Sequence, residues 1–364
     1  MPSISADSPG TPASVVPADA RTVIRPFTLA DAPHAIPHIV EFWNCAYRDQ
    51  RNFQPLTPEI FQRRILDCPA FVPEGLRLAW AESARPAEPG EAETRALVGM
   101  VHAFRAQPAT GVYTRWGAQP GIAHLHVLPA WRRQGIGSRL LQSAENWLYY
   151  CPVYVGAAGQ ACYGAVEGPR APLFGSTQAL AINAQDGATL QFFARHGYRV
   201  YEPGDVSLRL EMAQPPAPSA TATPDLPKGM RVIEVSHRHP YTGEEPPGRA
   251  EYSLWGDNRG DPYTALLIVD DAQRLFGHIG WYPMARAQHT AICSFWLAPQ
   301  LRGRRAGAWL LDAALQRIYH APSPEGGMKA VEVHTHSVRH PVATHLYEAR
   351  GFRLEAAWAA LVKM

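Results

Sequence analysis

Residues 124–148 read HLHVLPAWRRQGIGSRLLQSAENWL, which combines a strand, a glycine-containing turn and a helix. Alternating residues up to Pro129 predict the strand, and apolar residues at helical spacing predict an amphipathic helix after the turn. The N–H groups that open a helix lack intrahelical acceptors and, with the helix dipole, favour an anion such as a pyrophosphate. Gly135 and Gly137 remove side chains that would block its approach. The alternative is a basic surface turn kept for solubility, but the strand, arginine and helix around the glycines favour the anion site.

The pattern returns later in the chain as SFWLAPQLRGRRAGAWLLDAALQRI, residues 294–318. Both copies continue into a strand, a short helix, a Gly-aromatic pair and a final strand, in FFARHGYRVYEPGDVSLRLEM (192–212) and LYEARGFRLEAAWAALVKM (346–364). Between them, AQPPAPSATATPDLPK (213–228) is too rich in Pro, Ala, Ser and Thr to pack in a core, and it predicts a linker. This internal repeat predicts two copies of one α/β domain.

The predicted organisation is a disordered tail at 1–19, a first domain at 20–212, a Pro-rich linker at 213–227 and an abbreviated second domain at 228–364. The first domain is lengthened by CYGAVEGPRAPLFGSTQALAIN (162–183), which predicts an inserted loop. In the second domain, the connection at 237–262 is too rich in Gly and Pro to form two full helices.

Alternation and β-branched or aromatic content predict the remaining strands, and apolar residues at helical spacing predict the early helices. The first half has predicted strands at Thr22–Pro26, Leu76–Ala81, Ala96–Ala103 and Val153–Ala157, and predicted helices at Ala35–Tyr47 and Thr57–Leu66. The second half has predicted strands at Arg231–Val235, Tyr263–Val269 and Leu275–Trp281.

Composition excludes several classes of function. The 34 basic and 32 acidic residues give a net charge of +2, which argues against a nucleic acid or an anionic membrane as main partner. Five scattered cysteines without a CxxC pair argue against a zinc site or a disulfide framework. We also find no signal peptide and no apolar stretch long enough for a membrane span. We therefore expect a cytoplasmic protein, either a monomer or a homodimer.

The sequence resembles the GCN5-related N-acetyltransferase (GNAT) superfamily, whose coenzyme signature is a Leu-x-Val-x-Pro strand followed by Arg/Gln-x-x-Gly-x-Gly/Ala. The matching residues are Leu125, Val127, Pro129, Arg132, Gly135 and Gly137. The resemblance implies domains with a curved, mostly antiparallel mixed sheet flanked by helices (α+β), and acetyl-CoA (coenzyme A) as cofactor. It implies that the backbone of Leu125, His126 and Val127 contacts the pantetheine. It also implies that the turn holds the pyrophosphate, through Arg132, Arg133, Gln134, Gly135, Ile136, Gly137 and Ser138.

The second copy departs from this signature, because Arg305 stands where the first glycine is expected. A long side chain there is expected to fill the space that the phosphates need, although its charge could attract them. We expect a degenerate coenzyme site in this copy.

Acetyl transfer needs a base for the acceptor ammonium, donors for the tetrahedral oxyanion and an acid for the departing thiolate. In the superfamily the acid is often a tyrosine four residues before the Gly-aromatic pair. The second copy has Tyr347 there, whereas the first copy has Phe193, which cannot donate a proton. Tyr347 is therefore a candidate acid, with a buried core tyrosine as the alternative.

The strand before the first turn carries no acidic residue, but alternation places His124 and His126 on one of its faces. Either histidine could serve as base, or both could be structural. Glu41 and Asp49 lie on the early helical region, where acidic residues are mostly solvated. We expect neither to be catalytic.

Two other clusters are weaker candidates. Four histidines in HTHSVRHPVATH suggest a metal site but lack a carboxylate or cysteine at a recognised spacing; they are His334, His336, His340 and His345. Four tryptophans could line a ligand pocket or form the second core; they are Trp255, Trp281, Trp296 and Trp309.

The sequence thus predicts an N-acetyltransferase that transfers acetyl from acetyl-CoA to a primary amine of a small molecule or peptide, by direct attack in a ternary complex. The alternatives are a non-catalytic acyl-CoA sensor or assembly module, and an acyltransferase with a longer acyl chain. We expect no metal cofactor.

Overall fold

The computed structural model describes residues 20–49, 55–67, 71–83, 95–105, 120–149, 152–155, 182–214, 216, 226–236, 264–284, 288–321 and 330–364. The predicted tail, most of the predicted linker and inserted loop, and the connection at 237–262 lie outside these ranges.

In the first half, the structure confirms the predicted strands and helices with small shifts of their ends. The strands are β1 (Arg21–Pro26), β2 (Leu76–Glu82), β3 (Arg95–Phe104), β4 (Gly121–Val127), β5 (Val153–Val155), β6 (Ile182–Asn183) and β7 (Arg199–Glu211). The helices are α1 (Ala32–Tyr47), α2 (Pro58–Phe61), α3 (Ile136–Leu148) and α5 (Gly187–Arg195), and a π-helical turn at Gln62–Leu66 continues α2.

The second half repeats this order from its second strand onward. Its strands are β8 (Arg231–Ser236), β9 (Thr264–Val269), β10 (Leu275–Pro283), β11 (His289–Leu297), β12 (Ala330–His336) and β13 (Arg353–Lys363). Its helices are α6 (Ala306–His320), which follows β11 as α3 follows β4, and α7 (Pro341–Glu348). The predicted internal repeat is thus present in the structure.

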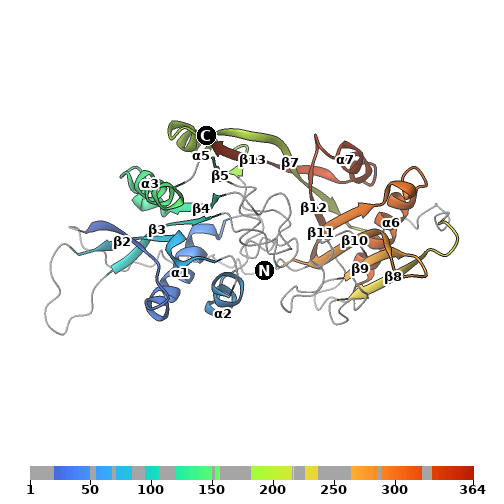
Figure 1. The fold of residues 1–364 in the computed structure, drawn as a ribbon, viewed down its shortest axis with the longest axis horizontal. Helices are drawn as coiled ribbons and strands as arrows, with labels where there is room; N and C mark the ends of the chain where they lie inside the picture. The colour runs from blue at the N-terminus through green and yellow to red at the C-terminus, as the bar shows by residue number, and fades with distance from the viewer. Residues whose placement is uncertain are drawn as a thin grey trace, which may run out of the picture.

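The strands of the described residues join one mixed sheet, and among these strands only the β4–β5 and β11–β12 pairs are parallel. The order is β1-β2-β3-β4-β5-β13-β7-β12-β11-β10-β9-β8, with β6 also paired to β13. The final strand β13 of the second half therefore lies beside β5, and the final strand β7 of the first half lies beside β12. Figure 1 shows these two long strands running past each other across the middle of the molecule.

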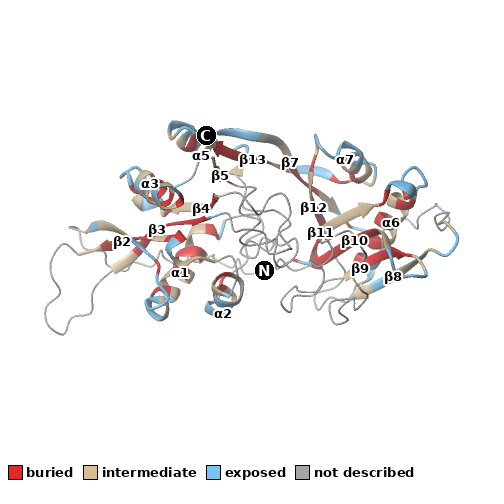
Figure 2. Ribbon diagram, in the orientation of Figure 1, coloured by how far each residue is buried: buried red, intermediate tan, exposed pale blue. Residues whose placement is uncertain are grey.

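This exchange of final strands is built into both cores. Ala359 and Leu361 of β13 pack with the core under α3, and Leu208 of β7 packs with the core under α6. Between the two strands, the indole Nε1 of Trp358 donates to Ser207 Oγ at 2.9 Å, and both residues are buried. Figure 2 shows the buried residues continuing along the central strands from one half into the other.

The sequence predicted two separate sheets, whereas the structure shows one continuous sheet. The difference arises because each half leaves a gap between its fifth strand and its own final strand, and the other half fills that gap. The predicted inserted loop also ends differently, since its last two residues form β6 and pair with Trp358 and Ala359.

Helices cover both faces of the first half of the sheet. Helices α1 and α2 pack on one face through Ile39, Phe42 and Phe61. On the opposite face α3 packs through Leu140 and Leu141, with α5 beside it. This arrangement separates the helix that follows the glycine turn from the helices that face His124 and His126.

Candidate functional site

Strand β4 extends beyond its described neighbour β5 next to the predicted coenzyme turn. The described pairs between them are Gly121–Tyr154 and Ile122–Val155; the described part of β5 ends at Val155, whereas β4 continues to Val127. Among the described residues, no strand pairs with the rest of β4 on this side. In the second half, strands β11 and β12 diverge, because their pairing ends at Ile292–Val333 while β11 continues to Leu297 and β12 to His336.

The turns that follow β4 and β11 have the same backbone conformation. In the first turn (residues 132–138), the left-handed positions are Arg133 (φ 65°) and Gly135 (φ 75°). In the second turn (residues 302–308), they are Gly303 (φ 76°) and Arg305 (φ 60°). Each turn thus places one arginine and one glycine at the two left-handed positions, in opposite order. Arg305, which replaces the first glycine of the coenzyme signature, keeps the left-handed backbone conformation of that position and adds a side chain there.

The two glycines of the first turn have different surroundings. A Cβ atom on Gly135 would meet nothing within 4 Å, so this glycine keeps open the space in front of the helix start. A Cβ on Gly137 would lie 3.5 Å from the Phe192 ring and 3.8 Å from Val127, so Gly137 sits against α5 and β4. Gly135 therefore controls access to the turn, and Gly137 controls how closely α3 approaches its neighbours.

The side chain of Arg132 joins the first turn to β4. Its Nε donates to the Val127 carbonyl at 2.9 Å, and its Nη2 lies 3.3 Å from His126 Nε2. Since a guanidinium only donates, His126 Nε2 accepts and its proton lies on Nδ1. In the second turn Arg302 donates to the Leu297 carbonyl at 3.4 Å, but Trp296 replaces the histidine.

Ser138, in the first turn of α3, contacts a residue that the sequence reading missed. Its Oγ lies 3.0 Å from His196 Nε2, while His196 Nδ1 lies 2.8 Å from the Phe192 carbonyl. His196 ends α5 and directly precedes Gly197-Tyr198. Nothing in the local pattern marks it, because its partner is 58 residues away along the chain.

The structure brings His124 and His126 together under α1, as their alternation predicted. His124 is buried, with Trp43 against its ring and the Tyr47 hydroxyl 3.4 Å from its Nδ1. Burial lowers the pKa of His124 well below 6.5. Burial and, to a lesser degree, the Arg132 charge lower the pKa of His126 to about 4. Both histidines are therefore neutral near pH 7.

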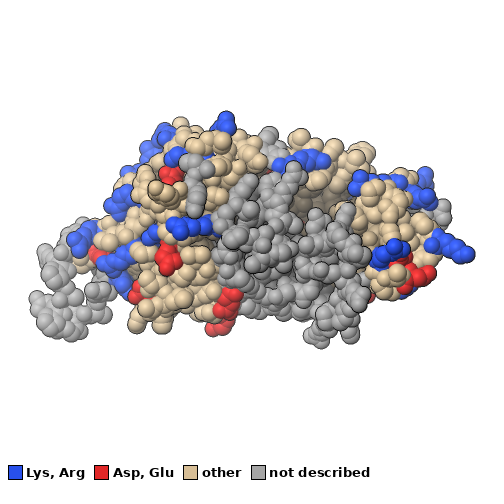
Figure 3. All heavy atoms as spheres, in the orientation of Figure 1, with Lys and Arg blue, Asp and Glu red and all other residues tan. Residues whose placement is uncertain are grey.

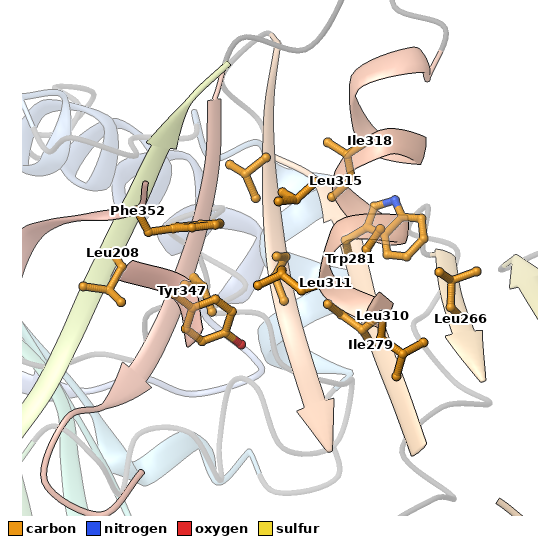
Figure 4. Close-up of a cluster of buried hydrophobic side chains, with 14 of the residues drawn as sticks. Leu208, Leu266, Ile279, Trp281, Leu310, Leu311, Leu315, Ile318, Tyr347 and Phe352 are labelled. Carbon is orange, nitrogen blue, oxygen red and sulfur yellow. The ribbon is translucent and has the colours of Figure 1, made fainter. Parts of the chain in front are cut away.

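Tyr347 lies in the core of the second half, near Phe352 (Figure 4). Its ring centroid is 6.2 Å from that of Phe295 and 5.4 Å from that of Phe352. Burial raises its pKa, and the nearby Cys293 thiol adds to that effect. Its counterpart Phe193 packs against Phe192 and Tyr198 in the first half. None of the ring contacts found for Tyr347 in the described part of the chain reaches β4.

The weaker candidates are dispersed. Glu41 and Asp49 are exposed. No group of three or more potential ligands that could hold a metal occurs among the described residues. Trp281 belongs to the core under α6, and Trp309 packs against that core. Trp296 lies beside His278. Trp255 falls outside the described residues.

Two further observations concern partners. On the face drawn in Figure 3, basic and acidic side chains are interspersed over both halves, in keeping with the nearly balanced charge. No helix in the described ranges is both long and apolar enough to cross a membrane.

Comparison with known proteins identifies the repeated unit. A family model described as the acetyltransferase (GNAT) domain matches residues 91–200, and one described as the acetyltransferase (GNAT) family matches residues 231–352. No curated protein matches the chain significantly.

Three solved structures share the fold. A tandem GNAT protein from the clavulanic acid biosynthesis pathway is 17% identical with a TM-score of 0.62, over 94% of this chain and 98% of that one. A GCN5-related N-acetyltransferase from Sphaerobacter thermophilus is 18% identical with a TM-score of 0.56, over 96% of both chains. A glucosamine N-acetyltransferase region of a fungal multi-domain β-N-acetylglucosaminidase is 12% identical with a TM-score of 0.54, over 95% of this chain and 38% of that one.

At these low sequence identities, the similarity to solved structures shows the fold alone. The two family models match the sequence itself, one in each half. The repeated turn and the two family matches lead to one conclusion: the chain is an acyltransferase and a tandem member of the GNAT family.

Proposed function

We propose that the first half binds acetyl-CoA at the first turn and transfers the acetyl group to a primary amine of a small molecule or peptide. The proposal rests mainly on the open space in front of Gly135, at the start of α3, where an added Cβ atom would meet nothing within 4 Å. Backbone N–H groups at such a helix start suit a pyrophosphate. The backbone of Leu125, His126 and Val127 pairs with β3 on one side, and in this proposal its other side contacts the amide groups of pantetheine.

Direct attack requires that coenzyme and amine bind at the same time, and β4 can separate the places where the two bind. In this proposal the coenzyme lies along the end of β4 that leads into the first turn, and the amine approaches from the α1 side, where His124 and His126 lie. A backbone N–H near Val127 stabilises the tetrahedral oxyanion.

We assign His126 as the side chain that contacts the acceptor, and its neutral Nδ1–H makes it a donor rather than a base. A group with a pKa of about 4 is a weak base toward an ammonium, and its Nε2 already accepts from Arg132. His124 is then a positioning residue, held by Tyr47. The ammonium loses its proton to water before attack, and the thiolate leaves without help from Phe193.

The second half has a supporting role in this proposal. It supplies β13 to the sheet of the first half, and Tyr347 is left as a candidate acid for its own half. The ranges 20–212 and 228–364 remain our proposed bounds for the two copies of the sequence repeat. We also propose a cytoplasmic location, where the free thiols of Cys45 and Cys293 stay reduced.

One alternative has a specific observation in its favour. The first half combines Phe193 with two histidines of low basicity, which suits a module that binds acyl-CoA without turnover. Turnover measured over a broad panel of primary amines separates the two functions, because the sensor binds coenzyme and acetylates none of them.

Calorimetric titration with coenzyme A tests the binding site through a matched pair of variants. Gly135→Arg places a side chain where Arg305 stands in the second turn, and the left-handed φ of Arg305 shows that this backbone accepts an arginine. We expect Gly135→Arg to abolish binding to the first turn and Arg305→Gly to leave it unchanged. A Gly135→Arg variant that binds as tightly as the parent would disprove the proposed site.

A further inference from the structure

Ser138 and His196 form a hydrogen-bonded pair behind the first turn. Ser138 is the third residue of α3, so its N–H is one of the donors that the helix leaves free. His196 Nδ1 lies 2.8 Å from the Phe192 carbonyl, and its Nε2 lies 3.0 Å from Ser138 Oγ. The Phe192 ring packs against the imidazole at 4.6 Å between centroids and against Gly137.

The hydrogen bonds fix where the protons lie. A carbonyl oxygen only accepts, so His196 Nδ1 carries a proton. In the neutral imidazole, Nε2 then accepts, and the Ser138 hydroxyl donates its single proton to it. Neutral His196 therefore leaves Ser138 with only lone pairs to present to a phosphate. A proton on Nε2 reverses this bond: His196 donates to Ser138, and the hydroxyl proton becomes free for a phosphate oxygen.

We propose that coenzyme binding at the first turn takes up one proton on His196, which makes His196 a positioning residue for the pyrophosphate. This inference rests on the proposed function, since it requires coenzyme at the first turn. The proton comes from solvent and forms an N–H bond at Nε2, and no other covalent bond changes. The resulting imidazolium adds a positive charge near the anion, and Ser138 adds a donor.

The second half lacks this pair. The residues at the corresponding positions are Ala308 and Arg350, and the Arg350 guanidinium binds Asp312 on α6 at 2.9 Å. The proton uptake is thus assigned to the first turn alone.

Charged side chains lie on α3, on β13 and on the segment of His196 itself. Glu145 on α3 and Lys363 on β13 bind each other at 3.0 Å, and Glu145 also accepts from the Tyr198 hydroxyl. Arg195 and Arg199 flank His196 on its own segment. Because Glu145 is committed to Lys363, Ser138 Oγ is the side-chain hydrogen-bond partner found for His196 Nε2 among the described residues.

Calorimetry with coenzyme A tests the inference in two buffers of different ionisation enthalpy at the same pH. We expect the full-length protein to take up protons on binding, and its Kd to rise with pH by up to about tenfold per pH unit. His196→Gln should lose this uptake and flatten the pH dependence. The exposed His345→Gln is the matched control and should behave as the parent. Because the coenzyme's own phosphate titrates near pH 6, the difference between parent and variant is the decisive quantity.

The outcomes separate the two proposals. If Gly135→Arg abolishes binding while His196→Gln shows the same proton uptake as the parent, the role of His196 is wrong and the coenzyme site stands. If Gly135→Arg changes nothing, the coenzyme site itself is wrong. Ser138→Ala supplies a second check, since it keeps the fold of α3 and should weaken binding at pH 6 more than at pH 8; an equal loss at both values would also overturn the inference.

Discussion

The Nζ atom of Lys363 lies 3.0 Å from both carboxylate oxygens of Glu145, which ties the last strand of the chain to the helix that follows the first turn. The Tyr198 hydroxyl donates to the same carboxylate at 2.8 Å. Lys363 belongs to the second half of the sequence, whereas Glu145 and Tyr198 belong to the first. The coenzyme helix of one half is therefore held by the end of the other.

A chain that ends at residue 212 is expected not to fold. It lacks β13, so β5 and β7 would have no strand between them, and the core under α3 would lose Ala359 and Leu361. Exposed strand edges of this kind promote aggregation. Circular dichroism and size exclusion check this, with residues 213–364 co-expressed as a control that should restore a folded complex. A monomeric, coenzyme-binding fragment 1–212 would contradict the strand exchange.

Lys363→Met is expected to destabilise the protein by about 1 kcal/mol, because it removes the ion pair of the mostly buried Glu145 and leaves the Tyr198 hydroxyl as its partner among the described residues. Thermal unfolding measures the change. The more exposed pair of Arg231 and Asp271 provides the control, since Arg231→Met should cost almost nothing.

Trp358→Phe tests the contact between the exchanged strands. It removes the only donor of the indole and leaves the fully buried Ser207 hydroxyl without that partner, so we expect a loss of about 1–3 kcal/mol. Adding Ser207→Ala to Trp358→Phe should recover part of this loss. Denaturant unfolding of the four members of the cycle provides the coupling energy; additive effects would count against the hydrogen bond.

Arg132→Lys is expected to raise the KM for acetyl-CoA about tenfold with a small change in melting temperature. A single ammonium cannot bind the Val127 carbonyl and His126 Nε2 in the fork geometry that the guanidinium uses. Arg302→Lys at the equivalent position is the control and should leave the KM unchanged. Equal effects of the two substitutions would argue against a special role for the first turn.

Stability is expected to fall as the pH drops below about 6.5. Burial lowers the pKa of His102 and His278 to about 3, whereas unfolded histidine titrates near 6.5. Below 6.5 the unfolded state binds protons that the folded state excludes, so each histidine contributes a loss of up to about 1.4 kcal/mol per pH unit until the folded pKa is reached. His278→Asn should make the pH dependence of unfolding shallower, and the exposed His345→Gln should not. Identical slopes would contradict the assignment.

Local pattern was enough to predict most of the elements and the position of the turn. The alternation in β4 correctly put His124 and His126 on one face, and the Gly-x-Gly spacing correctly marked the start of α3. Sequence could not show that Arg305 accepts a left-handed conformation, since this depends on the surrounding turn rather than on the residue type. It also missed His196, whose role depends on a contact between α5 and α3.

The sequence by itself determined the repeated strand-turn-helix unit, and with it the membership in the GNAT family, because these features depend on residue types at short spacings. The tertiary structure alone decided which strand lies beside which. Each final strand could have closed its own sheet, and alternation along a strand is the same whichever neighbour it pairs with. Long-range contacts such as Trp358 with Ser207 and Lys363 with Glu145 select the exchanged arrangement.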